Sequence, residues 1–168
     1  PQSGSDVAGI RTRARRCDGG YRISGSKIWC TNSHIADFVL VAAKTGDDDS
    51  ARAINLFIVE RGSKGFTVGR HEDKMGARGV PSCPLFLDEV FVAEANRIGE
   101  DGRGFKDVME AFNKSRPLIG ARGVGLAQGA IDHSIEFVSN RVTWGRKVSE
   151  NQGIRWMLAD MAIQTEAA

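Results

Sequence analysis

Short apolar runs and alternating positions dominate the first two-thirds of the chain. Apolar or small residues alternate with arginines over residues 10–15, which is the period of a half-buried strand. Further apolar runs bounded by Gly- and Asp-rich turns are residues 21–31, 38–43, 53–59, 65–69 and 84–92. About six or seven short strands in succession are typical of a closed or stacked sheet. We therefore expect an antiparallel β-barrel or sandwich domain over residues 1–100.

The period of the pattern changes after the glycine-rich segment 99–104. Phe105, Val108, Met109 and Phe112 recur at helical spacing, and the apolar stripe continues to residue 138. Pro117 lies inside this stripe and predicts a kink there. Residues 143–146 interrupt the pattern, and a second apolar face follows over residues 149–168. The fold class is therefore predicted as α+β, with residues 101–168 forming two helices of an antiparallel helical bundle.

Two helices cannot bury so many apolar side chains against each other alone. The chain also begins without Met and still reads as helix at Ala168. We therefore expect a piece of a longer protein, truncated at both ends, with further helices completing the bundle.

Composition narrows the classes of function. The 168 residues carry a net charge of +2, with 41% hydrophobic and 26% charged residues. These values are ordinary for a globular domain and disfavour a disordered tail or a strongly basic nucleic-acid-binding protein. The apolar runs are shorter than the ~18 residues that a membrane span needs.

The cysteines and histidines do not form a recognisable ligand pattern. Three cysteines without a CxxC pair cannot build a disulfide framework, which favours reduced thiols. The three histidines are scattered among them without metal-ligand spacing. The sequence therefore predicts no metal site.

Several segments combine small, aromatic and polar residues in ways that suit a bound ligand. The loop 3–6 could hold a phosphate or be a simple turn, and Gly102-x-Gly104 before a helix allows the same two interpretations. Trp29-Cys30-Thr31-Asn32 ends a strand with an aromatic plane, a hydroxyl and an amide, although Trp29 could also be structural. Arg116 stands in an apolar helical stretch and needs an anionic or carbonyl partner.

Taken in order, these segments resemble the acyl-CoA dehydrogenase family. The resemblance spans essentially the whole chain, and its order and spacing are more specific than any single motif. The matching segments are residues 1–9, 27–32, 74–78, 88–92, 96–99, 102–105, 116–117, 141–145 and 151–152.

The resemblance implies that a middle β-barrel and a C-terminal helical bundle clamp flavin adenine dinucleotide (FAD) and an acyl thioester. Trp29 would flank the isoalloxazine ring, Thr31 would bond to flavin N5, and Arg141 would reach the flavin of a neighbouring subunit. The cofactor-binding residues implied are Ser5, Trp29, Cys30, Thr31, Arg141, Thr143, Trp144, Asn151 and Gln152.

The same resemblance assigns substrate contacts to Ser5, Asn113 and Arg116. Most family members place the catalytic base, a Glu, at a position that would lie beyond Ala168. A minority place it one residue before the helical Arg, and that position is Ser115 here. We therefore expect no catalytic residue within this chain and a base Glu beyond Ala168.

The implied reaction is α,β-dehydrogenation of an acyl-CoA to a trans-2-enoyl-CoA, with hydride transfer to FAD. Electrons would then pass to an electron-transfer flavoprotein or another acceptor. The family implies a homodimer or homotetramer in the bacterial cytoplasm or the mitochondrial matrix. Two alternatives remain open: an oxygen-using relative, such as an acyl-CoA oxidase, a nitroalkane oxidase or a monooxygenase, and a non-catalytic interaction module.

Overall fold

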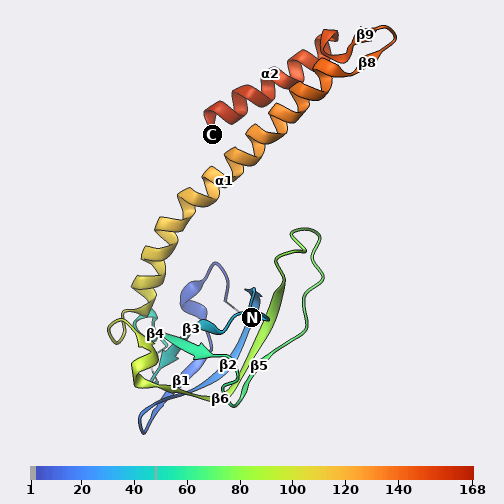
Figure 1. Ribbon diagram of the computed structural model, residues 1–168. Helices are drawn as coiled ribbons and strands as arrows, with labels where there is room; N and C mark the ends of the chain where they lie inside the picture. Colours follow the sequence, from blue (N-terminus) through green and yellow to red (C-terminus); the bar gives the residue numbers. More distant parts are fainter. Residues whose placement is uncertain (1–2, 48) are drawn as a thin grey trace. The chain divides into compact units, whose positions relative to one another are not determined.

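A computed structural model describes residues 3–47 and 49–168. The chain divides into two compact units, residues 1–110 and residues 111–168. The first unit contains the sheet and the second contains most of the helical residues, as the colours of Figure 1 show.

The first unit is built on seven strands that pair into one sheet. Their bounds are β1 Arg13–Cys17, β2 Gly20–Thr31, β3 Phe38–Thr45, β4 Ile54–Glu60, β5 Phe66–Val68, β6 Ser82–Ala93 and β7 Arg97–Ile98. The 3₁₀ turn η1 Val7–Gly9 precedes β1, while η2 Ala51–Ala53 lies between β3 and β4 and η3 Glu94–Asn96 lies between β6 and β7. The expected strands are thus confirmed, and β7 is an addition that the sequence did not predict.

The strand order is β5-β6-β2-β1-β3-β4-β7. Every pairing is antiparallel except that of β1 with β3, where Arg13 and Ala14 lie in parallel register with Lys44 and Thr45. The sheet is therefore mostly antiparallel, as expected, with one parallel pair. The long strands β2 and β6 lie side by side and form its largest pairing.

Inward-facing side chains of these strands form one apolar core. Tyr21 and Phe57 meet edge to face at its centre, with ring centroids 4.9 Å apart. The other buried members are Ala14, Ile23, Val41, Ala43, Val59, Leu87, Val90 and Val92. Thr12 and Ala14 are buried while Arg11 and Arg15 are exposed, which confirms the alternation read from the sequence.

Arginines of β1 pair with acidic side chains from other segments of the first unit. Arg15 lies 2.6 Å from Glu89, and Arg16 lies 3.5 Å from Glu94. The hydrogen bond from Arg15 is the main cause that holds the pKa of Glu89 below its usual value. The arginine run therefore belongs to a strand whose charges are paired within the protein.

The glycine-rich segment before the long helix is a tight turn. The amide of Gly102 donates to the Oδ1 atom of buried Asn55 at 2.9 Å, and Asn55 Nδ2 donates to Asp101 at 2.8 Å. A side chain at Gly104 would meet the Ile54 carbonyl oxygen at 2.6 Å. The amide that could have held a phosphate is thus engaged by the protein itself, which favours the turn interpretation.

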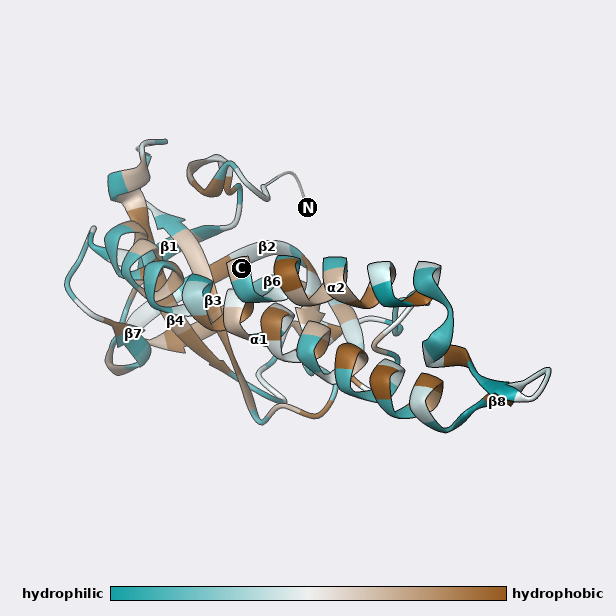
Figure 2. Ribbon diagram, turned by 90° about the horizontal axis from the view of Figure 1, so that it is seen from above, coloured by the Kyte–Doolittle hydropathy of each residue, from teal (hydrophilic) through white to brown (hydrophobic). Residues whose placement is uncertain are grey.

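Two helices carry the rest of the chain. Helix α1 spans Gly104–Asn140 and helix α2 spans Gln152–Ala167. Between them lie strands β8 Val142–Thr143 and β9 Arg146–Lys147 and the turn η4 Val148–Glu150. Helix α2 runs back alongside the end of α1 (Figures 1 and 2), so the antiparallel pair is confirmed. Helix α1 continues through Pro117 as a single helix.

Few apolar side chains of the second unit are buried. Within residues 111–168 only Ile131 and Val138 belong to the buried hydrophobic set. Hydrophobic positions recur along both helices in Figure 2, and large side chains among them are exposed. These exposed residues include Leu118, Ile119, Leu126, Ile135, Phe137, Trp156, Met157 and Ile163.

Candidate functional site

The end of β2 presents an aromatic plane and a hydroxyl on the surface of the first unit. The Trp29 side chain is 57% exposed, and Thr31 is exposed two residues later. Among the residues that the structure describes, no hydrogen bond engages the Thr31 hydroxyl. Both groups are therefore available to a ligand.

A backbone irregularity positions Trp29. The β2–β6 register shifts between Lys27 and Cys30, and Trp29 has a φ of 59°. A left-handed backbone costs a bulky residue about 1–3 kcal/mol and tends to occur at functional sites. A bulge also turns a side chain out of the normal alternation. Ile28 and Trp29 are consequently exposed in succession.

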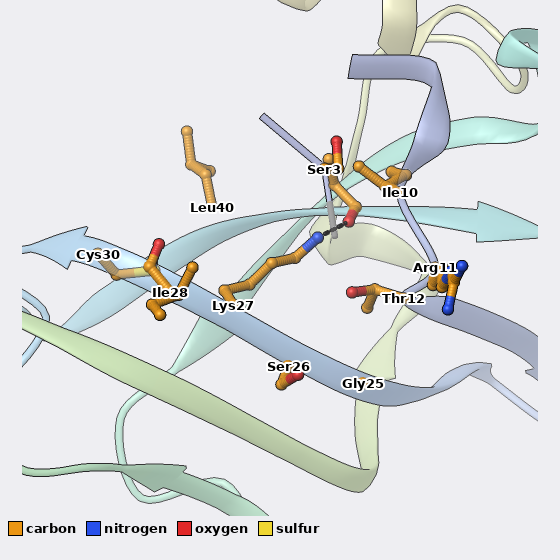
Figure 3. Close-up of a pocket in the computed structure, with 11 residues that line it drawn as sticks. Ser3, Ile10, Arg11, Thr12, Gly25, Ser26, Lys27, Ile28, Cys30 and Leu40 are labelled. Carbon is orange, nitrogen blue, oxygen red and sulfur yellow. Dashed lines mark hydrogen bonds between the residues drawn. The ribbon is translucent and has the colours of Figure 1, made fainter. Parts of the chain in front are cut away.

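Lys27 and Cys30 line a cavity of about 370 Å³ beside this strand end (Figure 3). The Lys27 ammonium donates to the Ala42 carbonyl oxygen at 2.7 Å. Burial lowers the pKa of Lys27 from 10.5 to about 8 and raises the pKa of the Cys30 thiol. Lys27 begins the matching segment 27–32, but no sequence pattern indicated that its amine would be buried.

Ser5 lies in the exposed loop that precedes η1. Ser3 donates its hydroxyl to the Asp6 carbonyl oxygen at 2.7 Å, and the Asp6 side chain accepts from the Gly9 amide at 3.2 Å. These bonds fold the loop into a turn and leave Ser5 exposed. Ser3 lines the cavity that also contains Lys27 and Cys30. The loop thus supplies a hydroxyl to the same part of the first unit.

A second group of the expected residues lies in the corner between α1 and α2. Val142 pairs with Lys147 and Thr143 pairs with Arg146, so Trp144 and Gly145 form a two-residue hairpin loop. Both have positive φ, 51° and 78°, as a type I′ turn requires. Asn-Gly is the usual pair at such a turn, and a Trp in the first place is held there against its backbone preference. The Trp144 side chain is 96% exposed.

The same corner contains a hollow of about 510 Å³. Its walls include Thr143, Trp144 and Asn151. Asn151 is already engaged, because it accepts from Arg146 at 2.8 Å and donates to the Val148 carbonyl oxygen at 3.0 Å. Asn151 therefore holds the corner together.

Arg141 and Gln152 flank this corner on either side. Both side chains are exposed. Arg141 also lines a shallow hollow with His133 and Phe137 on α1. Their exposure leaves both polar groups free to meet a ligand or a neighbouring subunit.

Asn113 and Arg116 lie one helical turn apart on α1. Arg116 donates to the Oδ1 atom of Asn113 at 2.6 Å, and both residues are exposed. Ser115 donates its hydroxyl to the Phe112 carbonyl oxygen at 3.1 Å. The polar partner expected for Arg116 is thus Asn113.

The expected residues fall into groups by unit. Ser5, Trp29, Cys30 and Thr31 belong to residues 1–110, and the rest belong to residues 111–168. Their roles toward cofactor and substrate stay predictions.

An aromatic face, a free hydroxyl and exposed polar groups fit a planar, phosphate-bearing cofactor such as FAD. Trp29 offers a surface on which a flat ring can stack, and Thr31 offers a donor beside it. Both belong to a strained strand end, where the free energy of ligand binding can offset the cost of the strain. The residues present are therefore compatible with the group that the resemblance implied.

None of the described helices is long and apolar enough to cross a membrane.

Comparisons with known proteins cover both units. The family model of the acyl-CoA dehydrogenase middle domain matches residues 1–90, and that of the acyl-CoA dehydrogenase C-terminal domain matches residues 102–168. An acyl-CoA dehydrogenase of Bacillus subtilis is 42% identical over 168 residues, which are 100% of this chain and 44% of that protein.

Solved structures agree with these matches. Butyryl-CoA dehydrogenase from Megasphaera elsdenii is 37% identical with a TM-score of 0.93, over 99% of this chain and 44% of that one. An FAD complex of PigA is 27% identical with a TM-score of 0.91, again over 99% and 44%. This chain thus spans less than half the length of these relatives. With both domain models matched in order and the fold shared throughout, the chain belongs to the acyl-CoA dehydrogenase family.

Proposed function

We propose that the protein containing this chain is an FAD-dependent dehydrogenase that oxidises an acyl-CoA to a trans-2-enoyl-CoA. The observation that carries the proposal is the exposed Trp29–Thr31 pair at the strained end of β2, in a chain of this family. FAD, when bound, would supply the hydride acceptor.

The chain's own residues would bind and orient the flavin and the acyl-CoA. The Trp29 indole would cover one face of the flavin ring, and the Thr31 hydroxyl would donate a hydrogen bond where negative charge develops. Ser5 would meet the pyrophosphate and the CoA portion of the substrate. Asn113 and Arg116, already paired, would present a polar edge to the acyl-CoA. Cys30 would line the cofactor-facing side of the strand.

The corner between α1 and α2 would contact the cofactor of a neighbouring copy of the chain. Arg141, Thr143, Trp144 and Gln152 would reach the flavin of another subunit, with Asn151 fixing the corner's shape. The exposed apolar helix faces support assembly into a homodimer or homotetramer.

The catalytic base would come from outside these residues. Ser115 is an unactivated hydroxyl whose proton is engaged by Phe112, and a guanidinium such as that of Arg116 stays protonated. A carboxylate beyond Ala168, with its pKa raised by a desolvated site, would remove the α-proton.

A single hydroxyl tests the flavin assignment. In the full-length protein, Thr31→Val should slow flavin bleaching by substrate about 10–100-fold, because a hydrogen bond to developing charge is worth about 1–3 kcal/mol. The measurement is anaerobic stopped-flow absorbance with a panel of straight and branched acyl-CoA esters. Thr67→Val on β5 is the matched control, since Thr67 is also an exposed strand threonine. Equal rates for both variants would contradict the role of Thr31.

The electron acceptor separates the proposal from an oxygen-using relative. The substrate-reduced protein should bleach an electron-accepting dye or reduce an electron-transfer flavoprotein while consuming little oxygen. Oxygen uptake that matches substrate turnover would contradict the dehydrogenase proposal and identify the protein as an oxidase. A full-length protein that retains no flavin would contradict both enzyme proposals and favour the non-catalytic interaction module.

A further inference from the structure

Three metal-ligating side chains from separate segments meet in the first unit. His34 lies in the turn after β2, His71 lies between β5 and β6, and Cys83 is the second residue of β6. One imidazole nitrogen of each histidine and the Cys83 Sγ atom all lie within 4.8 Å of one another. The sequence predicted no metal site, because none of these residues is at ligand spacing from another; only the folding of the sheet brings them together.

One atom of this group lacks a partner. The Nδ1 atom of His34 is buried and has no hydrogen-bond partner among residues 3–47 and 49–168. A buried polar atom without a partner costs about 1–3 kcal/mol, so it calls for an explanation. The His34 and His71 rings meet edge to face with centroids 4.4 Å apart. The unpartnered nitrogen therefore lies in a cluster of other potential ligands.

The surrounding backbone fixes the three segments next to one another. The Asn32 amide donates to the Pro81 carbonyl oxygen at 2.8 Å, and the Glu72 amide donates to the Ser82 carbonyl oxygen at 2.9 Å. The Cys83 side chain is fully buried in β6, directly opposite Cys30 in register. His34 and Cys83 thus lie in segments that a backbone hydrogen bond holds next to each other. The His71 side chain is exposed and can change its rotamer.

We propose that His34, His71 and Cys83 bind one zinc ion. Two imidazoles and a thiolate suit a borderline-soft cation such as zinc, whereas magnesium and calcium prefer oxygen ligands. Tetrahedral zinc places such ligand atoms about 3.3–3.6 Å apart, so the present group needs only side-chain rotation to close. Water fills the fourth position on the exposed side of His71.

Binding would release one proton from the Cys83 thiol to solvent, with both imidazoles in their neutral form. The ion would then tie the turn after β2 to the segment before β6. Thr31 is paired with Ser82 beside this point, so the tie would stiffen the strand end that carries Trp29 and Thr31. The site does not depend on the proposed dehydrogenase activity.

Zinc binding is tested directly on the full-length protein. The protein is stripped with a chelator and titrated with zinc in competition with a chromophoric chelator, and bound metal is counted by mass spectrometry. We expect one zinc per chain. Cobalt(II) in place of zinc should give a near-ultraviolet thiolate charge-transfer band that reports the Cys83 ligand.

Variants identify the ligands. His71→Asn should weaken zinc binding by about 100-fold or more, and because His71 is exposed the variant is expected to fold. His34→Asn should weaken it similarly, and Cys83→Ser should remove the cobalt band. His133→Asn and Cys17→Ser are matched controls, since these residues lie outside the cluster, and both should bind zinc as the parent does.

Three results would overturn the assignment. The first is a parent protein that takes up no zinc. The second is a His71→Asn variant that binds as tightly as the parent. The third is loss of binding in Cys30→Ser with full binding in both histidine variants, which would place the metal on the two facing cysteines instead.

Discussion

The two units of this chain bury their apolar residues to very different extents. The sheet unit encloses a contiguous core that includes Tyr21, Phe57 and Val90, all at most 1% exposed. Residues 111–168 contribute only Ile131 and Val138 to the buried hydrophobic set, and side chains as large as Phe137 and Trp156 are exposed. A sheet closes its apolar face through long-range pairing within itself, whereas two helices leave most of theirs uncovered.

The sheet unit also shifts the pKa of some of its own groups. Burial lowers the pKa of Lys27 and raises the pKa of the Cys30 thiol, and the hydrogen bond from Arg15 lowers the pKa of Glu89. We infer that the sheet unit determines the stability of this chain and its pH dependence, while the helical unit supplies a surface for assembly.

The largest expected effect comes from the centre of the sheet. In the 168-residue chain, Phe57→Ala should destabilise the sheet unit by about 3–5 kcal/mol, because it leaves a cavity next to Tyr21. Phe137→Ala, at a position 63% exposed, should cost less than about 1 kcal/mol. Amide hydrogen exchange, read segment by segment during urea titration, measures both. Comparable losses at the two positions would break the contrast between the units.

A smaller effect is expected from the buried amine of Lys27. Its pKa falls from 10.5 to about 8 on folding because of burial. Between these values the unfolded chain binds the proton more tightly, so stability should rise with pH, by up to about 3 kcal/mol. Urea midpoints measured from pH 8 upward give the slope.

Lys27→Met should remove this rise, and Lys64→Met, at an exposed position, should keep it. A rise that survives in Lys27→Met would mean that another group causes it.

Glycine-to-alanine changes in the two units should give smaller differences in stability. Gly65 has a φ of 86°, and an added Cβ would lie 2.1 Å from the Asp88 carbonyl oxygen, so Gly65→Ala should destabilise by more than ~1 kcal/mol. Gly125 on α1 has open space around it, and Gly125→Ala should stabilise by about 0.5–1 kcal/mol through helix propensity. Thermal unfolding of both variants checks the pair. Destabilisation by Gly125→Ala would show that this helix face is already covered.

Assembly into an oligomer would cover the apolar helix faces that are exposed in this chain. In an oligomer of the full-length protein, Arg141→Ala should weaken FAD retention through gel filtration if the corner reaches a neighbouring flavin. Arg122→Ala, which changes an exposed arginine within α1, should retain FAD as the parent does. Equal retention in both variants would contradict the proposed contact between subunits.

The sequence by itself determined the class of fold and the order of its parts. Period-two alternation located β1, and the change to helical spacing after residue 104 located α1, because these patterns follow from backbone geometry alone. The ordered motifs also identified the family, which the two domain matches confirm. They named Trp29 and Trp144 as candidates without indicating that both have positive φ.

Only the tertiary structure decided which distant residues meet. Long-range pairing buried Lys27, engaged the Gly102 amide with Asn55, and placed His34 and His71 beside Cys83. The parallel β1–β3 pairing likewise has no local signature, since a strand's sequence does not specify its partner's direction. The physical reason is common to all of them: local periodicity fixes which face of an element is apolar, and packing then decides which of those faces, loops and side chains become neighbours.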